Sequence, residues 1–258
     1  MLKIRLTPRS VGIFYLSLVP IFGIIYWLAD SLWKAPLGFV ESLYFSVVTI
    51  TTLGYGDISP ITDAGRILTG TQAILGIVSI GLFLNSVSER RAELQEKKRH
   101  DAVVGHLLWQ YKNFRESVTE ICLRAIAGGY NTDWKLKLHL PEMLKFREYF
   151  SENNSEKWYV VLNALESDDG LLQDLLVEID MFSEQVTFAL NNTSANDHEV
   201  LRFLTRFSQH PHRLNNLDVY SGDKVKYIGG FIYEVMAGWS VIDGYRDNDI
   251  FLERFKKL

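Results

Sequence analysis

The chain has 258 residues, a formal net charge of −4 and one cysteine. This length suffices for one or two domains with hydrophobic cores. A single cysteine excludes a disulfide framework within one chain, as expected in a reducing compartment. The charge is uneven, because residues 1–100 carry 10 Lys or Arg and 7 Asp or Glu, whereas residues 101–258 carry 17 and 24. The acidic excess of the second part argues against nucleic-acid binding, which requires a basic face.

The first long apolar segment, residues 11–29, contains no charged residue. Its 19 residues can cross the hydrocarbon core of a bilayer, which is about 30 Å thick. A signal peptide also has a basic start and an apolar core, but this run is longer and no small-residue cleavage site follows it. Tyr26, Trp27 and Trp33 are aromatic residues of the kind found at a membrane interface. We therefore predict an outer membrane helix at 11–29.

A second apolar segment, residues 67–88, has 22 residues without charge, and we predict an inner membrane helix at 65–92. Basic residues precede the first segment and follow the second, while only Lys34 and Arg66 lie between them. The positive-inside rule then places both termini, including residues 1–10, in the cytosol. The sequence predicts a multi-pass protein of the plasma or inner membrane.

Between the two spans, FVESLYFSVV is apolar but only half a membrane long, which predicts a re-entrant helix at 39–50. The stretch TITTLGYGD follows at 49–57. A surface turn could explain its glycines and aspartate. However, non-helical backbone at membrane depth is tolerated only where it is buried or lines water. We therefore predict that residues 51–57 line a water-filled path.

The two glycines of this stretch, Gly54 and Gly56, suit the coordination of a cation. Successive carbonyls of an extended chain point to opposite sides, and glycine permits the unusual φ and ψ that turn them to one side. Rings of such carbonyl oxygens can replace the hydration shell of K⁺. Because one chain supplies one oxygen to each ring, we expect four chains around a common axis.

TTLGYGD resembles the potassium-channel motif T-x-G-Y-G-D, and the order of elements over residues 11–92 resembles the two-transmembrane potassium channels. The resemblance implies a homotetramer in the lipid bilayer, with K⁺ as the permeant ion and no organic cofactor. It implies ion sites made by the carbonyls of Thr52, Leu53, Gly54 and Tyr55 and the Thr52 hydroxyl, in a filter completed by Gly56. It also implies supporting roles for Thr51, Asp57, Tyr44, Phe45 and Val48, with the Tyr44 hydroxyl within reach of Asp57.

The resemblance extends into the second span. Gly76 lies where the inner helices of simple bacterial channels bend, and Gly81 follows one turn later; both could instead be close-packing residues, which are common in membrane helices. A ring of leucines could gate such a pore by dewetting. The resemblance, aligned on Gly76, implies that four residues of the inner helix face the central cavity or the gate: Ile77, Ile80, Leu84 and Ser88.

The sequence shows no helix with Arg at every third position and no four spans ahead of Val11, so we expect no voltage sensor of the usual kind. One pore loop per chain favours four chains over a two-pore layout within one polypeptide.

Residues 93–258 are predicted to form a mostly helical cytosolic domain, so that the whole chain is mainly α. Apolar residues recur at three- and four-residue steps over 107–125 and again over 172–186, which indicates helices with one buried face, a coiled coil being the alternative. Residues 134–141, WKLKLHLP, alternate apolar and charged residues and favour a strand or an extended arm. Residues 227–242 predict a buried amphipathic helix rather than a third span.

Neither a G-x-G-x-x-G motif nor a recognisable nucleophile–base pair occurs in this region, so we expect no enzyme. His198, His210 and His212 suggest a metal site, but plain surface histidines are the favoured interpretation. We predict a potassium-selective channel whose gating is modulated by the C-terminal domain through a ligand or partner that the sequence does not name. The alternatives are a non-conducting membrane-anchored scaffold with a vestigial pore and a weakly selective cation channel.

Overall fold

The computed structural model describes residues 7–129, 133–151, 156–193, 197–209, 214 and 224–258. It divides into two compact units, Met1–Lys97 and Lys98–Leu258. The described part is helical except for one two-stranded sheet, which confirms the mainly α class.

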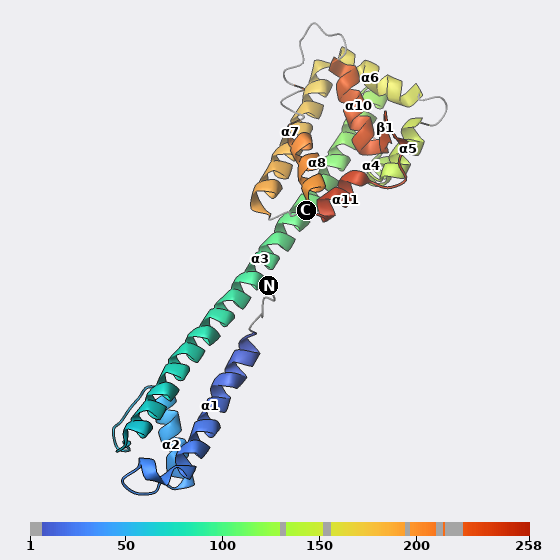
Figure 1. The fold of residues 1–258 in the computed structure, drawn as a ribbon. Coiled ribbons are helices and arrows are strands. Elements are labelled where there is room, and N and C mark those ends of the chain that lie inside the picture. Colours follow the sequence, from blue (N-terminus) through green and yellow to red (C-terminus); the bar gives the residue numbers. More distant parts are fainter. Residues whose placement is uncertain (1–6, 130–132, 152–155, 194–196, 210–213, 215–223) are drawn as a thin grey trace. The chain divides into compact units, whose positions relative to one another are not determined.

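The first unit contains two long apolar helices and a short one between them (Figure 1). α1 spans Pro8–Leu28, and the side chain of Thr7 caps it while Pro8 occupies its first turn. A 3₁₀ turn, η1, spans Asp30–Leu32, and α2 spans Phe39–Ile50. α1 and α3, which begins at Asp63, are each long and apolar enough to cross a membrane.

Aromatic rings from α1, η1 and α2 form the core of the first unit. Tyr26 packs edge-on against Trp33 and Phe45, with ring centroids 5.5 and 5.1 Å apart, and Trp33 lies 4.9 Å from Phe45. Tyr26 is completely buried and Trp33 is 5% exposed, whereas Trp27 is 45% exposed. The rings of Tyr26 and Trp33 therefore fill the space between helices, and their position at a membrane interface stays a prediction.

α3 is one continuous helix, Asp63–Ala127. The sequence places a domain boundary between residues 92 and 93, whereas the helix runs through it and the compact units divide after Lys97. Residues 89–99 are mostly Glu, Arg, Lys, Gln and Ala, which are strong helix formers. The helix ends only at Gly128, whose φ of +66° makes it a typical C-terminal glycine.

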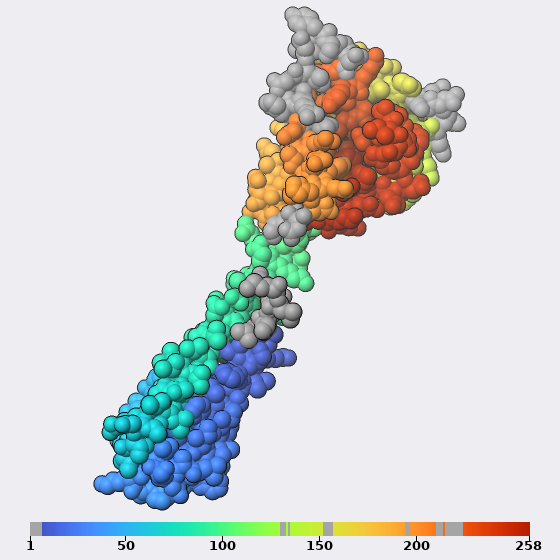
Figure 2. All heavy atoms as spheres, in the orientation of Figure 1, coloured from blue at the N-terminus to red at the C-terminus, as the bar shows by residue number. Residues whose placement is uncertain are grey.

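The second unit packs its helices around the C-terminal part of α3. Figure 1 shows α7 and α8 beside one another, and the space-filling view shows the orange α8 against the red C-terminal segments (Figure 2). The helices are α4 Trp134–His139, α5 Met143–Ser151, α6 Glu156–Ser167, α7 Asp169–Asn192, α8 His198–Ser208, α10 Lys224–Ala237 and α11 Ile250–Lys256.

Both predicted apolar stripes are confirmed, since their residues lie in the core of the second unit. The buried residues include, on α3, Leu107, Tyr111, Phe114, Val118, Ile121 and Ala125, and on α7, Leu175, Ile179, Phe182 and Val186. The stripe of α3 packs into a globular core and not into a coiled coil. The lone cysteine, Cys122, is buried there, and its burial raises the pKa of the thiol to about 12.

The prediction of a strand or arm at 134–141 is wrong, because this segment contains α4. Asp133 caps α4 by accepting a hydrogen bond from the Lys135 amide at 2.9 Å. A local cap thus outweighs an alternating pattern that is too short to specify a strand. The helix expected over 227–242 is α10, which is mostly buried but ends at Ala237. It is followed by the hairpin of β1, Trp239–Ser240, and β2, Gly244–Tyr245.

One buried arginine holds the C-terminal elements of the second unit together. Arg115 of α3 is 5% exposed and donates to the carbonyls of Pro141, Val235 and Met236 at 2.5, 2.7 and 2.9 Å. Its guanidinium also lies 3.5 Å from the Asp249 carboxylate, which caps α11. Burial raises the pKa of the neighbouring Tyr111, whose hydroxyl donates to Asp249. This cluster ties α3 to α10 and α11.

Candidate ion-conduction site

The filter segment, residues 51–57, begins where α2 ends. The backbone amides of Thr51, Thr52 and Leu53 donate to carbonyls of the last turns of α2, with N–O distances of 3.0–3.1 Å. The Thr51 hydroxyl also donates to the Val47 carbonyl at 2.6 Å. These bonds fix the start of the filter segment to the carboxyl end of α2, whose partial negative charge favours a cation.

The backbone of the filter segment alternates in handedness. Thr52, Gly54 and Gly56 have φ values of +57°, +55° and +79°. Glycine adopts positive φ at little cost, but Thr52 is the one non-glycine residue with positive φ in the described part of the chain. A β-branched residue with positive φ is strained, and such strain gathers at functional sites. The glycine pattern suggested this alternation, whereas no signal in the sequence predicted a positive φ at Thr52.

The predicted supporting residues contact different neighbours. The Tyr44 hydroxyl interacts with the carboxylate of Asp57, and this contact connects α2 to the far end of the filter segment. Val48 is buried, and its carbonyl accepts the Leu53 amide at 3.0 Å. Phe45 instead packs in the aromatic core described above, on the α1 side of α2. These contacts anchor α2 to the aromatic core of the first unit.

A buried polar cluster that the sequence interpretation missed joins all three helices of the first unit. Gln72 of α3 is fully buried and donates to the Ser46 carbonyl at 3.0 Å and to the Ser46 hydroxyl at 2.7 Å. The Tyr26 hydroxyl donates to the Gln72 amide oxygen at 2.7 Å, and the Ser46 hydroxyl donates to the Val19 carbonyl at 2.9 Å. A glutamine inside an apolar run of membrane-spanning length was the available signal, because such residues are costly there.

The two glycines predicted as hinges have different surroundings. A β-carbon added at Gly76 would lie 2.6 Å from the Ile50 carbonyl oxygen, whereas nothing lies within 4 Å of one added at Gly81. Gly76 is thus a close-packing residue against the end of α2. α3 passes through both positions as an unbroken helix, so a hinge at either of them stays a prediction.

The predicted cavity and gate residues share the face of α3 that does not pack on α1 or α2. The packed face holds Gln72, Gly76, Ser79 and Ser86, of which the three polar residues are buried. The remaining face exposes Ile77 at 58%, Ile80 at 45% and Leu84 at 61%, and Ser88 is exposed as well.

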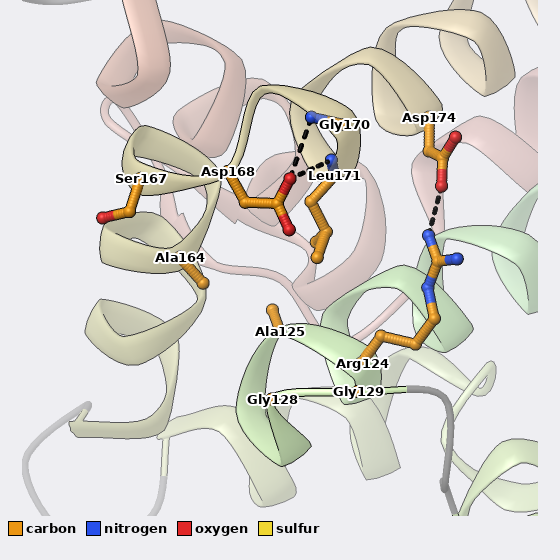
Figure 3. Close-up of a pocket in the computed structure, with 10 residues that line it drawn as sticks. All are labelled: Arg124, Ala125, Gly128, Gly129, Ala164, Ser167, Asp168, Gly170, Leu171 and Asp174. Atoms are coloured by element: carbon orange, nitrogen blue, oxygen red, sulfur yellow. Dashed lines mark hydrogen bonds and ion pairs between the residues drawn. The ribbon is translucent and has the colours of Figure 1, made fainter.

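The second unit has a cleft of about 550 Å³ between the end of α3 and the start of α7 (Figure 3). Asp168 caps α7 by accepting from the amides of Gly170 and Leu171 at 2.9 and 3.2 Å. Arg124 pairs with Asp174 across the cleft. The charged side chains that line the cleft, Arg124, Asp168 and Asp174, therefore already have partners within the fold.

The three histidines that suggested a metal site, with surface residues as the favoured interpretation, are only partly described by the structure. His198 is the exposed first residue of α8, while His210 and His212 lie outside the described residues. Within the described ranges, no group of three or more His, Cys, Asp or Glu could hold a metal ion.

Two long apolar helices, a half-length helix between them and a filter segment with alternating handedness define an ion-channel pore domain. Residues 14–92 match the ion channel family. This match and the potassium-channel relatives below support a pore domain of the two-transmembrane potassium-channel type for this region. The family is one of membrane channels and not of enzymes.

Plant channels are among the curated relatives. Two pore potassium channel b of Oryza sativa subsp. japonica is 30% identical over 106 residues, which cover 38% of this chain and 30% of that protein. Two-pore potassium channel 4 of Arabidopsis thaliana is 39% identical over 77 residues, 27% of each chain. Two-pore potassium channel 1 of the same plant is 41% identical over 59 residues, 23% of this chain and 16% of that protein. The chain thus spans less than a third of these relatives. No solved structure matches it.

Proposed function

We propose that the protein is a potassium-selective channel that conducts K⁺ passively down its electrochemical gradient. The observation that supports this most strongly is the alternation of positive φ at Thr52, Gly54 and Gly56, directly after α2. In a regular extended chain, successive carbonyls point to opposite sides. A positive φ at every second residue rotates the peptide units so that successive carbonyls point to the same side. A stack of carbonyl oxygens facing one axis is the arrangement that replaces the water shell of K⁺.

In this proposal the carbonyls of Thr52, Leu53, Gly54 and Tyr55 coordinate K⁺, and the Thr52 hydroxyl adds a layer at the inner end. One chain gives one oxygen to each layer, so four copies assemble around the conduction axis as a homotetramer. The exposure of Leu53 and Tyr55, 59% and 67% in a single chain, supports this assembly. Neighbouring copies would cover these two side chains.

The exposed face of α3 lines the inner cavity in this assembly, with Ile77, Ile80, Leu84 and Ser88 facing the axis. Leu84 and Ser88 form the inner constriction, and Gly76 or Gly81 allows the inner helices to bend. The basic residues at 90–91 and 97–99 support a cytosolic location of the second unit and of the N-terminus, at a plasma or inner membrane. Through α3, the second unit sets how often the gate opens.

The experiment is ion flux into liposomes that contain the purified full-length protein. We expect barium-sensitive K⁺ flux without Na⁺ flux. The matched variant is Gly54→Ala, which places a β-carbon at a φ of +55° that side chains rarely adopt and which should abolish K⁺ flux by straining the filter backbone. Flux of both ions in the wild type would favour the weakly selective cation channel. Absence of flux of either ion, both in the full-length protein and after removal of residues 101–258, would favour the non-conducting scaffold.

A further inference from the structure

The buried cluster around Gln72 brings together one polar side chain from each helix of the first unit. Tyr26 comes from α1, Ser46 from α2 and Gln72 from α3, and each is fully buried. The Gln72 amide uses its oxygen for Tyr26 and its nitrogen for Ser46. An amide buried among apolar helices is stable only when such partners satisfy it.

The cluster also fixes the register of α3 along α2. Gln72 contacts Ser46, and one turn later Gly76 lies against the carbonyl of Ile50. The spacing is four residues on both helices, so the two contacts lie along one line of packing. α1 also packs closely on α2 at Gly23, where an added β-carbon would lie 2.6 Å from the Leu43 side chain.

α2 leads directly into the filter segment, so its depth and rotation determine where the carbonyls of that segment lie. The Ser46 carbonyl is one turn before the last residue of α2, and Ile50, the last residue, is the second point of contact. A shift of α2 would pass through the hydrogen bonds of the 51–53 amides to the whole segment.

We propose that Gln72 is a positioning residue for the filter: its hydrogen bonds to Ser46 and Tyr26 hold α2 at the depth that aligns the carbonyls of residues 52–55. The inference rests on the proposed function. It adds that ion selectivity depends on a side chain of α3 that does not touch the ion.

The test is Gln72→Met, which keeps the length of the side chain and removes its three hydrogen bonds to Tyr26 and Ser46. The matched control is Thr71→Val on the same helix, because the Thr71 hydroxyl bonds only the Ile67 carbonyl of its own helix. A second variant, Ser46→Ala, removes the hydroxyl to which Gln72 donates and keeps the Ser46 carbonyl. It leaves no large void and is used if Gln72→Met does not assemble. Each full-length protein is reconstituted, and its K⁺/Na⁺ permeability ratio is measured. A second measurement compares the thermal midpoint of each protein in detergent with K⁺ and with Na⁺, and the rise in K⁺ is called the K⁺ protection.

We expect Gln72→Met to lower the permeability ratio about tenfold or more and to abolish the K⁺ protection, with Ser46→Ala in between and Thr71→Val unchanged. In the double variant Gln72→Met/Ser46→Ala the effects should be less than additive, because each change removes the same hydrogen bond between the Gln72 amide and the Ser46 hydroxyl. Assembled Gln72→Met with the wild-type ratio and K⁺ protection would overturn the inference and leave the channel function intact. A wild-type protein with neither K⁺ flux nor K⁺ protection would overturn the channel function and this inference with it.

Discussion

Substitution of Gly76 by alanine should separate packing at the end of α2 from a requirement for glycine as such. The new β-carbon would lie 2.6 Å from the Ile50 carbonyl oxygen and 2.8 Å from its Cγ1. Non-bonded carbon atoms pack at about 3.5–4.0 Å, so the end of α2 must move by several tenths of an ångström or more. Overpacking of this kind costs about 1–3 kcal/mol, and the gain from alanine in a helix, about 0.5–1 kcal/mol, offsets only part of it.

Gly81→Ala is the matched control, because nothing lies within 4 Å of the added β-carbon. We expect Gly76→Ala to lower the thermal midpoint of the purified protein in detergent, measured by near-ultraviolet circular dichroism. Gly81→Ala should keep or raise that midpoint. Because Ile50 precedes the filter segment, Gly76→Ala should also lower the K⁺/Na⁺ permeability ratio. A Gly76→Ala midpoint equal to or above that of Gly81→Ala would refute the packing argument and favour a role in bending alone.

Two further predictions concern the second unit. Arg115→Ala removes the ion-pair partner of the half-buried Asp249 and the guanidinium donor of three carbonyls. This should destabilise α10 and α11 by about 3–5 kcal/mol and speed their hydrogen exchange more than a hundredfold. Lys112→Ala, which removes an exposed ion pair on the same helix, should change the exchange little, and equal exchange in both variants would contradict the role assigned to Arg115. Because the pKa of Cys122 is raised to about 12, its thiolate stays below about one part in a hundred as pH rises from 7 to 9. Labelling by a thiol reagent should therefore remain slow across that range and become fast on unfolding in urea; rapid labelling of the folded protein at pH 9 would show that the thiol is accessible.

Local sequence patterns predicted the features that local chemistry determines. The charge-free runs predict the two long helices, and the alternating glycines predict the handedness seen at Gly54 and Gly56. The sequence did not predict the burial of Tyr26, because a tyrosine near the end of an apolar helix has the same local pattern whether it faces lipid or protein. Its burial depends on Trp33 and Phe45, which approach only in the folded unit.

The remaining features depend on contacts between distant segments. Gln72 and Ser46 are 26 residues apart, and Arg115 binds carbonyls more than 100 residues away. Periodicity places Arg115 four residues after Tyr111, on the buried face of α3, and this position of a charged residue was a usable signal. Two of the three carbonyls that it binds belong to the end of α10 and the third to Pro141, and none of them could be assigned from the pattern.

The central claim is that the filter segment selects K⁺. The most direct measurement is the reversal potential of single channels in planar bilayers with K⁺ on one side and Na⁺ on the other, with barium added to identify the current. A filter of aligned carbonyls predicts a K⁺/Na⁺ permeability ratio well above tenfold, which corresponds to more than about 1.4 kcal/mol of discrimination. A reversal potential near zero with barium-sensitive current would contradict it.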